Sequence, residues 1–174
     1  MKILIVASSL NQESKSRQLA DELELALKDK DDLEIDLLDL KEADLPLCDG
    51  GAAYEDERVI AAKEKVEAAD GIVFASPIYV YNVNAAMKNF VELTGHSMKG
   101  KVAGFLCSAG GRMSYMSVMS LANSLMLDFR MFVLPRFVYV AAEDWEGSAL
   151  KDEIKGRIGE FATSFQDFVG RMLD

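Results

Sequence analysis

The sequence predicts an α/β protein built on a doubly wound, five-stranded parallel sheet with helices on both faces. Two observations lead to this prediction. Short, almost continuously apolar runs alternate along the chain with longer segments of helical periodicity, which is typical of buried parallel strands joined by crossover helices. No repeat, linker or low-complexity segment divides the 174 residues, so we expect a single domain over residues 1–174.

The first half of the chain contains three apolar runs of strand length, at Lys2–Ala7, Leu33–Leu38 and Gly71–Ser76. Helical patterns at Ser14–Lys28 and Glu57–Ala69 lie between them, with apolar residues three and four positions apart. A proline and two glycines interrupt Asp39–Tyr54, so we expect a long connection there.

The second half continues the alternation. Three further helices are predicted, at Val83–Thr94, Met113–Phe129 and Ala149–Met172. Two further strands are predicted, at Lys101–Cys107 and Phe132–Ala141. The last strand contains Pro135, which cannot donate a hydrogen bond to a neighbouring strand, and we therefore expect it to be interrupted.

The helix predicted at Met113–Phe129 is apolar on nearly all sides. A helix in the outer layer of one domain is covered on one side only, so a second apolar side indicates contact with another subunit. We therefore expect a homodimer or a homotetramer.

Composition and charge exclude several functional classes. Half of the residues are apolar and 28% are charged, which is ordinary for a globular protein. The formal net charge of −10 argues against binding to nucleic acid or to an anionic membrane surface. No stretch approaches the roughly 18 apolar residues of a membrane-spanning helix, and the short apolar run at the N-terminus does not look like a signal peptide. We expect a cytoplasmic protein.

The cysteines and the histidine do not form a metal site. Cys48 and Cys107 are far apart and neither belongs to a CxxC motif, so we expect no bound metal and no disulfide. Cys107 ends an apolar run and is interpreted as a buried thiol, whereas Cys48 lies in a loop. His96 has no identifiable partner and is interpreted as structural.

The turn after the first strand is rich in hydroxyl groups. Its candidate binding residues are Ser9, Asn11, Ser14 and Ser16, and Lys15 or Arg17 would add positive charge. Unpaired N–H groups and the helix dipole make a helix N-terminus suitable for a phosphate. The same residue types are also ordinary N-caps, so this segment alone leaves both interpretations open.

Two more loops follow strands of the predicted sheet, and in such folds ligands bind beyond the carboxyl ends of the strands. The first supplies aromatic rings and amides suited to a planar ligand, in Pro77, Ile78, Tyr79, Val80, Tyr81 and Asn82. The second supplies paired glycines, which permit a positive φ and a close approach of the backbone, in Ser108, Gly110, Gly111 and Arg112. Each loop taken alone also fits an ordinary turn, but three at one edge indicate a site. Neither GxGxxG nor GxxxxGK[ST] occurs, which argues against a dinucleotide-binding Rossmann motif and a P-loop.

With these motifs the chain resembles the NADPH-dependent FMN reductase family, whose fold is flavodoxin-like. Residues of the first motif that match are Ser9, Leu10, Ser14 and Ser16, while Ser8 stands for the usual Gly and Asn11 for the usual Arg. Residues of the second motif that match are Pro77, Tyr79, Met87, Lys88 and Asn89, with Val80–Tyr81 in place of Asn-Gly. Gly110–Gly111 match the third motif, and Leu45–Leu47 resemble the family's Leu-Pro-Leu segment.

The resemblance implies that the ligand is FMN and that NADPH or NADH supplies a hydride, which passes through FMN to a small acceptor such as a quinone, an azo compound or free flavin. Ser9, Asn11, Ser14 and Ser16 would hold the phosphate, and Pro77–Asn82 with Ser108–Gly111 would hold the ring. No catalytic side chain is expected, because the chemistry takes place on the flavin. N–H groups of Gly110 and Gly111 would stabilise the reduced ring, and Arg112 or Tyr81 would line the nicotinamide side.

Two alternatives remain open at this point. One is a flavodoxin-like electron carrier, although flavodoxins have a glycine in their phosphate loop and none occurs between Ala7 and Arg17. The other is a protein of the same fold that performs no flavin chemistry, acting in regulation or assembly.

Overall fold

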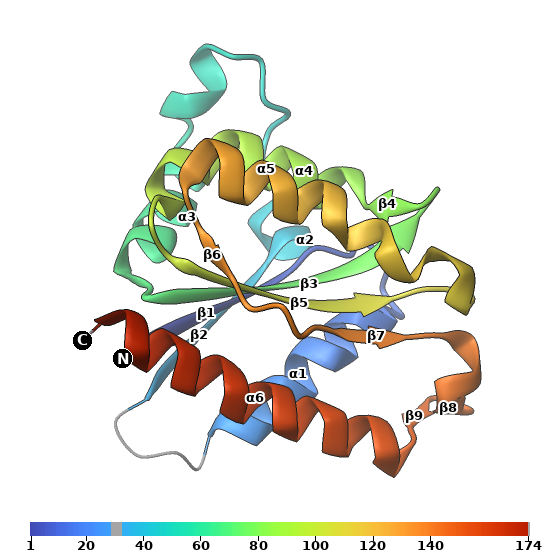
Figure 1. Cartoon of the computed structure of the whole chain (residues 1–174). Coiled ribbons are helices and arrows are strands. Elements are labelled where there is room, and N and C mark those ends of the chain that lie inside the picture. Colours follow the sequence, from blue (N-terminus) through green and yellow to red (C-terminus); the bar gives the residue numbers. More distant parts are fainter. Residues whose placement is uncertain (29–32, 174) are drawn as a thin grey trace.

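The computed structural model describes residues 1–28 and 33–173, and its centre is a parallel sheet in the order β2-β1-β3-β5-β6 (Figure 1). The strands are β1 (Lys2–Ala7), β2 (Glu34–Asp39), β3 (Gly71–Tyr79), β5 (Val102–Ser108) and β6 (Phe132–Val133), and β7 (Val138–Val140) also pairs with β5. This order reverses direction between β1 and β3, as in flavodoxin-like folds. The predicted fold class is confirmed.

Helices cover both faces of the sheet (Figure 1). On one face lie α1 (Lys15–Leu27) and α6 (Asp152–Leu173), and on the other lie α3 (Glu57–Ala68), α4 (Ala85–Thr94) and α5 (Met119–Phe129). Alternate residues of β1 pack into the two layers, since Ile3 and Ile5 belong to the core beneath α1 and α6 while Leu4 and Val6 belong to the opposite core. A Cβ at Gly104 of β5 would lie 2.7 Å from the Phe161 ring, so this glycine lets α6 pack closely against the sheet.

Several predicted boundaries are corrected by short elements. The connection after β2 contains α2 (Leu40–Ala43) and a 3₁₀ turn, η1 (Ala52–Glu55). A second 3₁₀ turn, η2 (Gly95–Met98), follows α4. The helix expected from Met113 starts instead as η3 (Arg112–Val118) before α5. After β7, η4 (Ala142–Asp144) leads to a small hairpin of β8 (Trp145–Glu146) and β9 (Ala149–Leu150), so the final helix begins three residues later than predicted.

The largest correction concerns β3, which continues past the predicted end at Ser76 to Tyr79 and turns back into β4 (Asn82–Val83). In the sequence, Pro77 indicates the end of the strand. In the structure, pairing with the antiparallel strand β4 extends β3 beyond Pro77. Pro135 interrupts the last strand as predicted, since β6 and β7 both pair with β5 on either side of it. None of the described helices combines the length and the apolar character that crossing a membrane requires.

Candidate functional site

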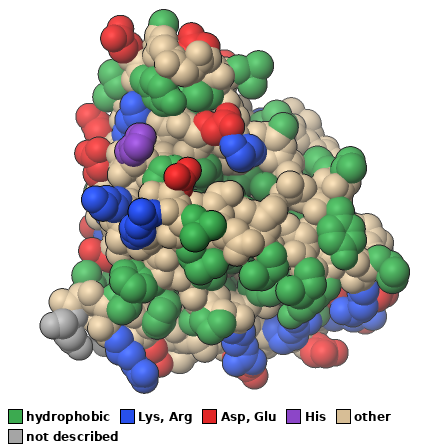
Figure 2. Space-filling view, turned by 45° about the horizontal axis from the view of Figure 1, so that its top comes forward, with side chains coloured by type: hydrophobic (Ala, Val, Ile, Leu, Met, Phe, Trp, Pro, Cys, Tyr) green, Lys and Arg blue, Asp and Glu red, His purple; other side chains and the backbone are tan. Residues whose placement is uncertain are grey.

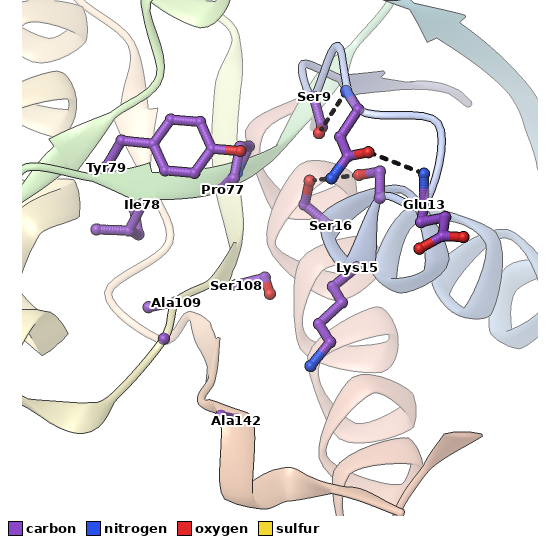
Figure 3. Close-up of a pocket in the computed structure, with 13 residues that line it drawn as sticks. Ser9, Glu13, Lys15, Ser16, Pro77, Ile78, Tyr79, Ser108, Ala109 and Ala142 are labelled. Atoms are coloured by element: carbon purple, nitrogen blue, oxygen red, sulfur yellow. Dashed lines mark hydrogen bonds between the residues drawn. The ribbon is translucent and has the colours of Figure 1, made fainter. Parts of the chain in front are cut away.

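The loops after β1, β3 and β5 line one cavity of about 270 Å³ at the carboxyl edge of the sheet (Figure 3). The predicted site residues that line it are Ser9, Asn11, Ser14, Ser16, Pro77, Ile78, Tyr79, Ser108 and Gly110. Figure 3 shows Pro77, Ile78 and Tyr79 across the cavity from Ser9 and Ser16. Hydroxyl groups therefore face one part of the cavity and an aromatic ring faces another.

The start of α1 has both features that the sequence left open, an ordinary N-cap and the geometry of a phosphate site. Ser14 is the N-cap: its Oγ accepts a hydrogen bond from Arg17 N at 3.0 Å and lies 3.1 Å from Ser16 Oγ. The backbone N–H groups of Lys15 and Ser16 have no hydrogen-bond partner among the described residues. A capped helix that still presents two unpaired N–H groups to a cavity has the geometry of an anion site.

The turn before α1 is held by its own side chains. Asn11 Oδ1 accepts from Glu13 N at 3.1 Å, and Asn11 N donates to Ser9 Oγ at 3.3 Å (Figure 3). Where the resemblance expects an arginine, Asn11 thus shapes the backbone of the loop and supplies no charge.

A buried network beneath the cavity joins the first two loops, and the sequence analysis missed it. Asn84 Nδ2 donates to Ser8 O at 2.7 Å, while Asn84 Oδ1 accepts from Ser8 Oγ at 2.7 Å and from Ser76 Oγ at 3.2 Å. Asn84 is also the N-cap of α4, accepting from Met87 N. An Asn before an apolar helix signals the cap, but only the fold brings Ser8 within its reach.

The remaining residues of the second loop form a hairpin at the rim. Val80 and Tyr81 form the turn between β3 and β4 with φ of 50° and 62°, both in the left-handed region. Tyr81 Oη donates to Met113 O at 2.9 Å, and Asn82 Oδ1 accepts from Ser120 Oγ at 2.8 Å. Val80, Tyr81 and Asn82 therefore lie outside the cavity lining, tied to the segment that follows β5.

The third loop contributes backbone and open space. Neither Gly110 nor Gly111 has a positive φ, so conformational freedom is not what these glycines provide. A Cβ at either position would meet no atom within 4 Å, which leaves room for a ligand to approach the backbone. Tyr139 Oη donates to Gly111 O at 2.6 Å and holds the loop from below.

Arg112 is bound by two carboxylates and does not line the cavity. Its Nε lies 2.7 Å from Glu143 Oε1, and its Nη2 lies 2.6 Å from Oδ1 of the buried Asp144. These carboxylates raise the pKa of the Arg112 guanidinium, chiefly through the hydrogen bond to Glu143. The structure thus places Gly111 and Arg112 next to the lining residues but not among them.

Three lining residues were not among the predicted binding residues: Glu13, Lys15 and Ala142. Ala109 also lines the cavity and lies within the predicted segment Ser108–Gly111. Lys15 had been recognised only as a source of charge. Arg17, the other such candidate, is engaged by Asp21 at 2.8 Å and Asp39 at 2.5 Å. Ala142 follows β7, 30 residues after Arg112 at the end of the third loop, so periodicity does not indicate that it belongs to the site.

The two cysteines and the histidine lie outside the cavity lining. Cys107 is buried, and desolvation raises the pKa of its thiol to about 12. His96 packs edge-on against the Phe129 ring at 5.9 Å, away from the cavity lining. Over residues 1–28 and 33–173, no group of three or more His, Cys, Asp or Glu side chains could hold a metal ion.

A parallel sheet of this order, with an anion-suited helix start and an aromatic loop at the point where the strand order reverses, defines a flavodoxin-like nucleotide-binding protein. The chain belongs to the NADPH-dependent FMN reductase family, whose model matches residues 1–146. It is therefore an oxidoreductase of the kind for which FMN and NAD(P)H are the expected cofactors.

One relative agrees with this family, and two solved structures agree with the fold. The chain is 30% identical over 137 residues to an NAD(P)H-dependent FAD/FMN reductase of Geobacillus thermodenitrificans, covering 75% of this chain and 73% of the relative. It is similar in fold to an oxidoreductase from Corynebacterium diphtheriae, with a TM-score of 0.80, 20% identity and coverage of 98% and 97%. The same TM-score, with 21% identity and 98% coverage of both chains, relates it to a flavoenzyme NAD(P)H:(acceptor) oxidoreductase from Paracoccus denitrificans.

Proposed function

We propose that this chain is an FMN-dependent NAD(P)H oxidoreductase that reduces a small acceptor such as a quinone, an azo compound or free flavin. The observation that carries the proposal is the meeting of three loops on one cavity, with hydroxyl and N–H donors at one part and Tyr79 at another. The family match supplies the class of reaction.

The residues present fit FMN. Its phosphate needs hydrogen-bond donors and a favourable dipole, which the start of α1 offers through the unpaired N–H groups of Lys15 and Ser16 and the hydroxyls around them. We assign Ser9, Asn11, Ser14 and Ser16 to the phosphate. The ring needs a flat apolar contact and an open edge, so we assign it to the loops Pro77–Asn82 and Ser108–Gly111, where the space beside Gly110 is open.

The role of the chain in the reaction is to hold and orient. FMN, when bound, would supply the redox chemistry by which a hydride of the nicotinamide is passed on to the acceptor. The polar network of Asn84 fixes the first two loops relative to one another, and Tyr139 fixes the third. N–H groups of Gly110 and Gly111 would stabilise negative charge on the reduced ring. No side chain needs to act as an acid, base or nucleophile.

The nicotinamide and the acceptor would approach from the rim. Tyr81, exposed on the hairpin, is proposed to line that side. Arg112 would contact a nicotinamide nucleotide only by giving up its two carboxylate partners. Because NAD(P)H is supplied inside cells, we also propose a cytoplasmic location.

We propose that the chain assembles as a homodimer or a homotetramer through the face that carries α5. Figure 2 shows hydrophobic side chains spread over this side of the molecule. Exposed apolar residues on and beside α5 are Met116, Met119, Met126, Leu127 and Phe132. An exposed apolar face on a single chain usually marks a surface that another protein molecule covers.

The assembly is tested by Leu127→Glu, which puts a charge on a side chain that is 75% exposed. We expect light scattering to show a multiple of 19.2 kDa for the wild type and a shift toward the single-chain mass for the variant. Leu25→Glu is the matched control, since Leu25 is an exposed leucine of α1 on the opposite face. A wild-type chain that stays monomeric at high concentration would contradict the proposal.

The function is tested by absorbance. We expect the purified protein to be yellow, or to become so with added FMN, and anaerobic NADPH or NADH to bleach the flavin. Addition of a quinone, an azo dye or free flavin should then restore the colour. A flavin that binds but stays oxidised with both nucleotides would match an electron carrier, and a protein that takes up no flavin would match a regulatory or assembly role.

A further inference from the structure

One charged side chain in the cavity has no role in the family's motifs as they appear here. Of the described residues that line the cavity, Lys15 alone is cationic. It follows the N-cap Ser14, and Figure 3 shows its side chain extending from the start of α1 toward the space between Ser108 and Ala142. No carboxylate in the described part of the chain forms an ion pair with it.

Lys15 is held by an aromatic ring instead. Its Nζ lies 5.0 Å from the centre of the Trp145 ring, a cation–π contact that leaves the positive charge intact. Trp145 is only 8% exposed and packs into the core beneath α1 and α6. Its Nε1 is buried and has no hydrogen-bond partner among the described residues, so no polar contact fixes the indole. The ring is placed by apolar packing, and one of its faces meets the lysine.

The neighbouring charged residues show why this arrangement matters. Arg17, two residues further along α1, is neutralised by Asp21 and Asp39. Glu13 also lines the cavity, but in Figure 3 its carboxylate and the ammonium group of Lys15 point in different directions. Lys15 is therefore the charge available to an anion in this cavity.

We propose that Lys15, positioned by Trp145, supplies the positive charge that binds the phosphate of FMN, in place of the arginine that the family resemblance expects at Asn11. Asn11 cannot supply that charge, and its side-chain oxygen is already used by Glu13 N. The positive charge is thus supplied by Lys15 in the first turn of α1, four residues after position 11 in the loop, where the resemblance expects it. This inference rests on the proposed function, because it assumes that FMN is the ligand.

The test compares FMN with riboflavin, which has the same ring but no phosphate. Quenching of flavin fluorescence gives both dissociation constants. For Lys15→Met we expect FMN to bind about tenfold more weakly, as for the loss of one charge-assisted contact, and riboflavin to change by less than about twofold. Lys15→Arg should keep the preference for FMN. Raising the salt concentration should weaken FMN binding more in the wild type than in Lys15→Met.

The matched control is Lys28→Met, which makes the same change of charge at the other end of α1. It should leave both dissociation constants unchanged. Equal effects of Lys15→Met on FMN and riboflavin, or no effect on either, would overturn the proposal.

Trp145 is tested as a positioning residue. Trp145→Leu should weaken FMN binding about threefold while riboflavin binding holds, whereas Trp145→Phe keeps an aromatic face and should resemble the wild type. A merely structural tryptophan would affect both flavins alike, and that result would remove Trp145 from the proposal. Wild-type protein that binds neither flavin would refute the proposed function itself, whereas flavin binding without a Lys15-dependent preference for FMN would refute only this inference.

Discussion

The two parts of the candidate cavity are built in opposite ways. At the start of α1, the serines are buried, the turns are closed by side-chain hydrogen bonds, and every φ lies in an ordinary region. At the β3–β4 hairpin, Val80 and Tyr81 have positive φ and hydrophobic side chains that stand in solvent. Val80 is 100% exposed.

The two parts differ because they would meet different partners: the start of α1 would hold the phosphate, and the hairpin would meet a molecule outside the chain. A phosphate has fixed size and charge, and a rigid loop that is held by its own hydrogen bonds and leaves N–H groups free at the helix start suits it. The hairpin instead presents apolar groups at the rim, at the cost of backbone strain. Strain and exposed apolar surface together indicate contact with something outside the single chain, either the acceptor or a second subunit.

The largest expected effect comes from breaking the rigid part. Asn84→Ala removes a helix cap and the side-chain donor to the buried Ser8 carbonyl, so we expect a loss of about 3 kcal/mol in the free energy of unfolding. The Ser8 and Ser76 hydroxyls lose Asn84 Oδ1 and keep Ala75 O and Pro77 O as acceptors. Chemical denaturation measures this value. Asn82→Ala is the control, because the side chain of that exposed asparagine accepts only from groups at the surface, Val83 N and Ser120 Oγ, and should cost much less, under about 1 kcal/mol. Similar values for the two variants would show that the network does not stabilise the site.

The sequence predicted the rigid part better than the hairpin, for physical reasons. Buried strands and helix caps are local patterns, so β1, the start of α1 and the convergence of three loops follow from periodicity and from the rule for parallel sheets. The Val80–Tyr81 turn does not follow, because both residue types disfavour positive φ and a hairpin there requires β4 to pair with β3. Likewise, Trp145 and Ala142 reach the cavity region only through the path of the chain after β7.

A smaller effect of opposite sign is expected at the hairpin. Val80→Asn should raise the free energy of unfolding by about 1 kcal/mol, because asparagine tolerates the left-handed region and valine does not. Val80→Ala, which keeps an ordinary L-residue at the same φ, should give little gain. Denaturation at low protein concentration is the measurement. If Val80→Asn instead destabilises the protein, and does so more at high concentration, Val80 is buried by a second copy of the chain.

The smallest effect on activity is expected at Arg112, which is exposed like the hairpin but held by hydrogen bonds like the start of α1. It is exposed at the rim, yet its guanidinium is already bound by Glu143 and Asp144. Arg112→Ala should therefore change the KM for NADPH by less than about threefold, although it should lower the Tm, since the buried Asp144 carboxylate loses its cation and keeps only the N–H of Ala141. Arg136→Ala, which breaks one exposed ion pair with Glu160, should alter neither quantity. A tenfold rise in KM would mean that Arg112 leaves its carboxylates to bind the nucleotide, and the rim would then rearrange when the nucleotide binds.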